Sequence, residues 1–139
     1  MNLFFKVNRY LAGIMDGQKQ YRADLHEEHH IHKLDAPSGT ALTLARDLIL
    51  QHSDYTAHTM EAAQAGELPI TALREAEIPG THRIRWSSPE DELTIEHKAF
   101  GRTGFALGAV HAAEWLNTPD SNGNRRSGLF TFEDVLSNF

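Results

Sequence analysis

Histidines, a lysine and two hydroxyl residues crowd into one short stretch of the chain. The segment 25–41 has the sequence LHEEHHIHKLDAPSGTA and holds four of the nine histidines. Imidazole, ammonium and hydroxyl groups can bind metal ions, transfer protons or hold anions. Two kinds of chemistry therefore compete for this segment, a metal site and an anion site.

The metal hypothesis depends on a literal match to the pattern H-E-x-x-H, which runs from His26 to His30. That pattern binds zinc only on a helix, where side chains four residues apart lie about 5–6 Å from one another on one face. On a strand the same two residues lie about 13 Å apart, too far for one zinc ion. The residues 21–30 show no helical apolar face, so the sequence favours a strand without a metal.

The anion hypothesis places a ligand at the start of a helix. A helix amino terminus offers unpaired N–H groups and a partial positive charge, which suit a carboxylate or a phosphate. Ser38, Gly39 and Thr40 would lie there, with two hydroxyl donors and an open backbone, and Lys33 and the histidines precede them. A solvated loop with an ordinary Ser or Thr helix cap explains the same residues, and both interpretations remain open.

The order of helices and strands predicts the frame around this segment. Apolar spacing predicts helices over 3–15 (ending near Gly17), 40–49 and 105–116. Strands are expected over 21–30, 70–74, 83–86 and 92–98, with a turn at 89–91. Loops are expected over 29–39, 53–69 and 118–127, and a short helix over 131–138, capped by Thr131 with Asp134. The result is an α+β fold: a small mixed sheet with helices on one face, for which partner subunits are one plausible cover of the other face.

Composition limits the class of protein. The 139 residues fit one domain, and a net charge of −6 argues against a general nucleic-acid binder. The absence of cysteine excludes a disulfide framework and a thiolate nucleophile. No apolar run approaches the roughly 18 residues of a membrane span, and no signal-peptide pattern opens the chain. We expect a cytoplasmic protein with no membrane or nucleic-acid partner.

Residues 29–41, HHIHKLDAPSGTA, resemble the H-H-x-x-K-x-D-A-P-S-G-T-A signature of dihydrodipicolinate reductase. Further resemblance lies in IEHKA at 95–99, Arg102, FALGA at 105–109, AAEWL at 112–116, SGLF at 127–130 and DVL at 134–136. With the opening Asn2-Leu3-Phe4, it spans essentially the whole chain. The family transfers a hydride from NADH or NADPH to a cyclic dihydrodipicolinate-type dicarboxylate, giving tetrahydrodipicolinate in lysine and diaminopimelate biosynthesis.

The resemblance implies roles for individual residues. His29 would be the general acid, since the unperturbed pKa of histidine lies near 6.5. Lys33 would pair with a substrate carboxylate or share the proton transfer. Carboxylates would also be held by His30, Ser38, Gly39 and Thr40. Arg102 would close the site or touch the cofactor, whereas His82 and His97 are interpreted as structural residues bonded within the sheet.

The sequence departs from the family in two places. The family's Rossmann domain, which binds the cofactor, is not recognisable in this chain; the glycines at 101, 104 and 108 have the wrong spacing and are interpreted as turn and packing positions. Ala76 replaces an expected glycine, so that turn is expected to differ.

We therefore expect 1–139 to be a substrate-binding and oligomerisation domain. The resemblance implies a homotetramer, and NAD(P)H bound only by the full-length enzyme. The chain alone should then bind no cofactor and be inactive. The alternatives are a non-catalytic oligomerisation module and a zinc metallohydrolase built on His26 and His30.

Overall fold

The computed structural model describes residues 1–136, which form two compact units. The first unit holds Leu3–Phe100 together with Met1, and the second holds Asn2 and the chain from Gly101 onward. The first unit contains α1 (Asn2–Met15), β1 (Arg22–His29), α2 (Gly39–Gln51), β2 (Ala57–Thr59), β3 (Glu67–Arg74), β4 (Thr81–Ser87) and β5 (Glu92–Lys98). The second contains α3 (Thr103–Asn117) and α4 (Phe132–Leu136).

The sheet is mixed, with the strand order β2-β3-β1-β4-β5. Strands β1 and β3 pair in parallel, so the chain must cross over between them, and α2 lies in this crossover. Strand β4 pairs antiparallel with both β1 and β5. This topology confirms the predicted α+β fold and puts the 30–38 loop between the end of β1 and the start of α2.

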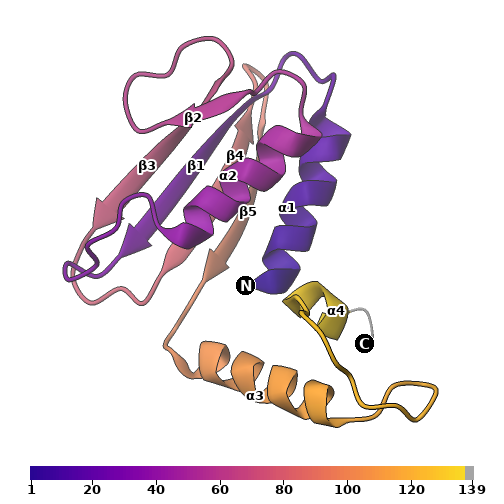
Figure 1. The fold of residues 1–139 in the computed structure, drawn as a ribbon. Helices are drawn as coiled ribbons and strands as arrows, with labels where there is room; N and C mark the ends of the chain where they lie inside the picture. Colours follow the sequence, from indigo (N-terminus) through magenta and orange to yellow (C-terminus); the bar gives the residue numbers. More distant parts are fainter. Residues whose placement is uncertain (137–139) are drawn as a thin grey trace. The chain divides into compact units, whose positions relative to one another are not determined.

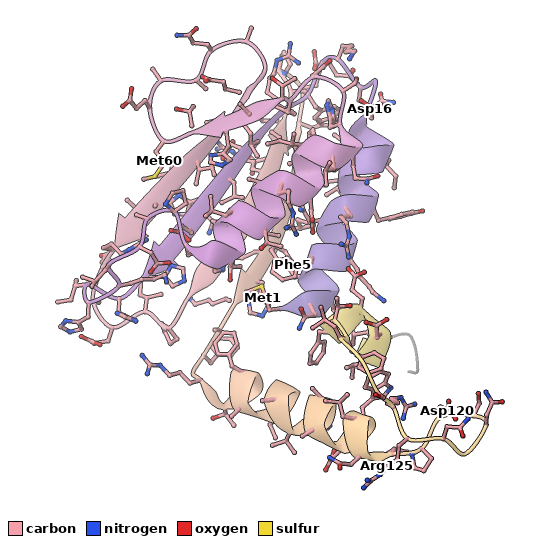
Figure 2. The ribbon with its side chains drawn as sticks, viewed as in Figure 1. Met1, Phe5, Asp16, Met60, Asp120 and Arg125 are labelled. Atoms are coloured by element: carbon pink, nitrogen blue, oxygen red, sulfur yellow. The ribbon has the colours of Figure 1, made fainter. Side chains whose placement is uncertain are left out.

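Helices α1 and α2 lie on one face of the sheet (Figure 1). Along β1 every second residue is buried, namely Ala23, Leu25, Glu27 and His29. Trp86, which pairs with Ala23 across β1 and β4, is fully buried in the same core. Asp16 ends α1, and its carboxylate accepts hydrogen bonds of 2.8 and 2.7 Å from the backbone and hydroxyl of Ser53, which ties α1 to the end of α2 (Figure 2).

The other face of the sheet is charged. Arg85 pairs with Asp24 at 2.7 Å, and Arg83 with Glu96 at 2.5 Å. Such alternation of apolar and polar faces is what a partly antiparallel sheet shows when one side meets water. The composition of this face does not require a cover, so coverage by partner subunits stays a prediction.

The sequence-based prediction of a loop over 53–69 was wrong in part. Strand β2 lies inside this range, and β3 begins at Glu67 rather than at Ile70. The segment lacks alternating apolar residues because β2 is an edge strand of three residues, held by its pairing with β3.

In the second unit, α3 has no buried residue in the described part of the chain. Helix α4 begins one residue after Thr131, as the cap predicted. The Asp134 carboxylate accepts hydrogen bonds of 2.6 and 2.8 Å from the backbone N–H and hydroxyl of Thr131. The predicted helix continued to residue 138, and its last two positions lie outside the described residues. Among the described residues, no helix is both long and apolar enough to cross a membrane.

Candidate functional site

Glu27, near the end of β1, is fully buried although it is a carboxylate. Its Oε1 accepts hydrogen bonds of 3.0 Å from the backbone N–H of Ser38 and 3.0 Å from the Arg74 guanidinium. Its Oε2 lies 3.6 Å from Nδ1 of His29 and 3.5 Å from Nε2 of His82. Four groups from four parts of the chain therefore converge on one carboxylate.

This carboxylate is ionised at neutral pH. Burial alone would raise the pKa of Glu27, but hydrogen bonds from His82, Ser38 and Arg74 outweigh it and lower the pKa to about 2. A buried charge is retained only where donors and opposite charges compensate the lost hydration. The site therefore contains one fixed negative charge, paired with the Arg74 cation.

His29 is buried beside this charge, with 8% of its surface exposed. Its Nδ1 is fully buried and has no hydrogen-bond partner among the described residues. Nε2 points towards Gly80, where a Cβ atom would lie only 3.1 Å away. Gly80 also has a φ of +149°, so no other residue fits there without strain.

Burial makes protonated His29 a stronger acid than an ordinary histidine, whose pKa lies near 6.5. Desolvation lowers the pKa of His29 to about 4, and the opposing attraction of Glu27 is too weak to restore it. The imidazole is therefore neutral at pH 7 in the free chain. A dianion bound beside the ring would favour its protonated form and raise this pKa.

Arg74 shapes the loop that follows β1. Its guanidinium donates to the backbone carbonyls of Lys33 (3.3 Å) and Asp35 (2.5 Å) in addition to Glu27. The Lys33 ammonium in turn binds both carboxylate oxygens of Asp35, at 2.7 and 2.9 Å. The peptide bond between Ala36 and Pro37 is cis. Asp35 thus braces the loop, and these contacts use two of the three N–H donors of Lys33.

Two features at the start of α2 bear on the anion hypothesis, which stays a prediction. Gly39 is exposed, and nothing lies within 4 Å of the position of a Cβ atom on it, so a ligand can approach its backbone. The Ser38 hydroxyl, however, accepts from the backbone N–H of Ala41 at 3.1 Å and lies 3.2 Å from Nε2 of His82. That hydroxyl caps the helix and joins the buried cluster; its contact with a substrate stays a prediction.

The structure brings most of the predicted site residues to one end of β1. His29, Lys33 and Ser38 are linked through Glu27 and Arg74, and Thr40 follows half-buried in the first turn of α2. His30 is half-buried with an unpartnered Nδ1, and its ring lies 6.0 Å from that of His32. Arg102 precedes α3 in the second unit, and its role stays a prediction.

Sequence reasoning missed Glu27 and Arg74, and it interpreted His82 as a residue bonded within the sheet. The His82 side chain does contact the Glu27 carboxylate within the sheet, and it also contacts the Ser38 hydroxyl of the loop. Residues 27, 74 and 82 lie on three strands, so no linear pattern connects them. A glutamate at a buried position of an alternating strand was the available signal.

The geometry argues against the zinc hypothesis. His26 lies within β1 and His30 directly follows it, so they cannot share a helical face. Among the described residues, the one group with metal-ligand spacing is Glu27, His29 and His82. The Arg74 guanidinium, 3.0 Å from Glu27, already supplies the positive charge that a metal ion would bring.

The residues present do not fit a dinucleotide. In the described chain the parallel unit β1–α2–β3 connects its first strand and helix through HIHKLDAPSG, which lacks the glycine spacing of a pyrophosphate-binding turn. The glycines at 104 and 108 lie inside α3. A Cβ atom added to Gly108 would lie 3.8 Å from the Phe132 ring, an ordinary contact distance, whereas one added to Gly104 would meet nothing within 4 Å among the described residues.

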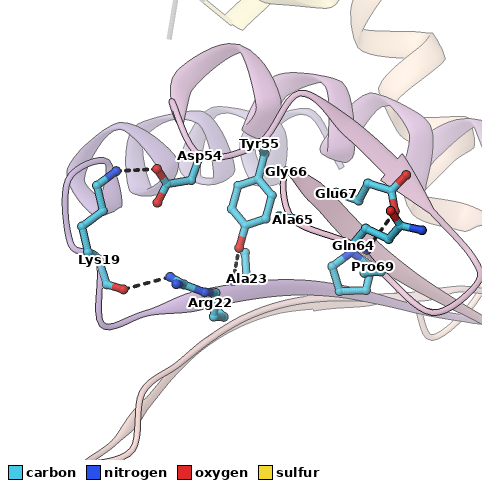
Figure 3. A pocket seen from close by; sticks show the side chains of 11 residues that line it. Lys19, Arg22, Ala23, Asp54, Tyr55, Gln64, Ala65, Gly66, Glu67 and Pro69 are labelled. Carbon is cyan, nitrogen blue, oxygen red and sulfur yellow. Dashed lines mark hydrogen bonds and ion pairs between the residues drawn. The ribbon is translucent and has the colours of Figure 1, made fainter.

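A separate pocket of about 580 Å³ opens at the amino ends of β1 and β3 (Figure 3). Lys19 and Asp54 form an ion pair at its rim, and the Tyr55 hydroxyl accepts a hydrogen bond of 2.7 Å from the backbone of Ala23. None of the predicted site residues lines this pocket. Its polar groups are engaged with one another, so it offers no evident ligand chemistry.

Comparison with known proteins identifies relatives of the whole chain. The family model described as "Dihydrodipicolinate reductase, C-terminus" matches residues 1–136. A 4-hydroxy-tetrahydrodipicolinate reductase of Christiangramia forsetii is 45% identical over 137 residues, which cover 99% of this chain and 54% of that protein. One of Akkermansia muciniphila is 37% identical over 144 residues, covering 98% and 55%.

A solved structure shares the fold. A dipicolinate-bound dihydrodipicolinate reductase from Paenisporosarcina sp. TG-14 superimposes with a TM-score of 0.58 and 22% identity, covering 78% of this chain and 44% of that chain. The chain spans about half the length of the curated relatives it matches. The family model and these relatives agree with the signature in the 29–41 loop, and the chain belongs to the family of dihydrodipicolinate reductase C-terminal domains.

Proposed function

We propose that this chain is the substrate-binding domain of a reductase that transfers a hydride from NAD(P)H to a cyclic dihydrodipicolinate-type dicarboxylate. The product would be tetrahydrodipicolinate, in lysine and diaminopimelate biosynthesis. The observation that carries the proposal is the site itself: a buried histidine, a lysine and a helix start with an exposed glycine lie at one end of β1. A planar dianion needs N–H and cationic donors of this kind.

Each residue has a defined part in this proposal. The helix start at Gly39 and Thr40 would hold one carboxylate, while Lys33 and His30 would hold the other. Binding of the dianion would raise the pKa of His29, so that the ring takes up the proton it later delivers. Support comes from the relative described with dipicolinate bound, which shares the fold.

The nicotinamide cofactor would bind to the full-length enzyme outside these residues, since the described chain lacks a dinucleotide-binding turn. We expect the 139-residue chain alone not to oxidise NADH or NADPH in the presence of substrate. A spectrophotometric assay at 340 nm checks this. Oxidation of NADH or NADPH faster than in the absence of protein would contradict the proposal that the cofactor binds outside these residues.

Titration with pyridine-2,6-dicarboxylate, followed by calorimetry or thermal shift, tests the anion site directly. We expect saturable binding that raises the melting temperature. Lys33→Ala should weaken binding at least about tenfold, because a charge-assisted hydrogen bond contributes about 1.5–3 kcal/mol. Lys6→Ala, which removes an exposed lysine of α1, is the matched control and should bind like the wild type.

Two results would count against the proposal. Equal binding by wild type and Lys33→Ala would remove the lysine from the site, and no binding by the folded wild type would favour the non-catalytic oligomerisation module. Because the ligand chelates zinc, the protein is first treated with EDTA. Destabilisation of untreated protein on adding the ligand would revive the metal hypothesis.

A further inference from the structure

We infer that Glu27 is a positioning residue, which holds neutral His29 in the Nδ1–H tautomer and couples that histidine to the substrate-binding turn. The inference depends on the proposed function for its catalytic meaning. Its structural content, the proton position on an imidazole, can be measured without any ligand.

The first argument is the position of the two ring nitrogens. Nδ1 of His29 is buried, has no other hydrogen-bond partner in the described chain, and lies 3.6 Å from Oε2 of Glu27. Oε2 is itself buried, and it also lies 3.5 Å from Nε2 of His82. A proton on Nδ1 points at this anion, whereas a lone pair on Nδ1 would face it. The distance is long for a hydrogen bond and can shorten when a ligand binds.

The second argument is the chemistry that this tautomer permits. With Nδ1 facing Glu27, Nε2 is the ring nitrogen left to exchange a proton with a ligand; its near neighbour Gly80 has no side chain, and a Cβ atom there would lie only 3.1 Å from Nε2. After the imidazolium gives its Nε2 proton to the substrate, the ring is left as the neutral Nδ1–H form. That is the form which the carboxylate favours, as the buried aspartate does for the histidine of serine proteases.

The third argument is the connection to the loop. The same carboxylate accepts from the backbone N–H of Ser38, directly before Gly39, and from Arg74, which holds the carbonyls of Lys33 and Asp35. His82 closes the cluster by contacting both Glu27 and the Ser38 hydroxyl. A shift of Glu27 would therefore displace the histidine and the helix start together, which makes it the common support of acid and anion site.

Long-range ¹H–¹⁵N spectra of the imidazoles at pH 7, without ligand, test the inference. In the wild type we expect the His29 signals of the Nδ1–H tautomer, assigned by their loss in His29→Gln. In Glu27→Gln the amide oxygen can still accept from Ser38, and its NH₂ then faces Nδ1 as a donor. We expect His29 to switch to the Nε2–H tautomer in this variant, and Glu27→Asp to restore Nδ1–H at least in part.

Glu28→Gln is the matched control. Glu28 is the next residue of β1, lies on the opposite face and bonds His26 at 3.0 Å, so its loss should leave the His29 tautomer unchanged. A wild-type His29 in the Nε2–H form would overturn the inference even if the Glu27 variants failed to fold. An unchanged tautomer in folded Glu27→Gln would also overturn it. Neither result depends on dicarboxylate binding, so a failure of this inference can be distinguished from a failure of the proposed function.

Discussion

His29, the proposed general acid, also affects the stability of the chain through its pKa. Its pKa falls from 6.5 towards about 4 on folding because burial disfavours the charged ring. Between these values the unfolded chain binds more protons than the folded chain, so the free energy of unfolding decreases as the pH falls through this window. Glu27 behaves differently: its lowered pKa stabilises the fold above pH 4.5, and this contribution is lost towards pH 2.

We predict that the lowered pKa of His29 reduces the free energy of unfolding of the wild type by about 2 kcal/mol as the pH falls from 7 to 5. Urea unfolding at the two pH values measures the change. His29→Gln should lack this part of the loss, although other histidines still contribute to both proteins. An identical pH dependence in wild type and variant would mean that His29 titrates normally in the folded chain.

At the scale of elements, the turn after β3 stores strain beside the site. Ala76 adopts a φ of 47°, the left-handed conformation that glycine prefers. Its carbonyl accepts from the backbone of Ile31, and the neighbouring Glu75 N–H donates to the carbonyl of His29 at 2.9 Å. In this chain alanine occupies the left-handed conformation, held by the bonds to the end of β1; whether the turn differs from that of its relatives stays a prediction.

We predict that Ala76→Gly stabilises the chain by about 1 kcal/mol. The left-handed conformation costs alanine about 1–2 kcal/mol, and glycine removes this cost. Part of the gain is lost because glycine also increases the conformational entropy of the unfolded chain. Ala72→Gly, in the regular part of β3, is the control and should destabilise the chain. Chemical denaturation of the three proteins compares them. A destabilising Ala76→Gly would show that the turn is relaxed with alanine in place.

The sequence predicted those elements whose own residues carry a pattern. Apolar spacing predicted α1, and the residues 89–91 predicted the turn between β4 and β5. The Ser38-Gly39 pair predicted the start of α2 to within one residue. Strand β2 could not be predicted in this way, since its three residues, two exposed and one half-buried, gain their conformation from pairing with β3. The family signature located the loop, but the buried support under it depends on contacts between strands that lie tens of residues apart.

At the scale of the whole molecule, the oligomeric state is a property that can be tested directly. The family resemblance implies a homotetramer, while the open sheet face carries ion pairs that water alone could accommodate. We predict a tetramer of four 15.6 kDa chains in size-exclusion chromatography with light scattering. A monomer at micromolar concentration would show that the open face of the sheet needs no partner in this chain.

The hydrogen bonds from Arg74 to the backbone of the loop have a consequence for how this site can evolve. The guanidinium holds the carbonyl oxygens of Lys33 and Asp35, which every amino acid carries, rather than their side chains. The path of the loop is thus largely independent of what stands at intervening positions such as Leu34, whose side chain is 97% exposed. Substitutions there should leave the shape of this backbone unchanged.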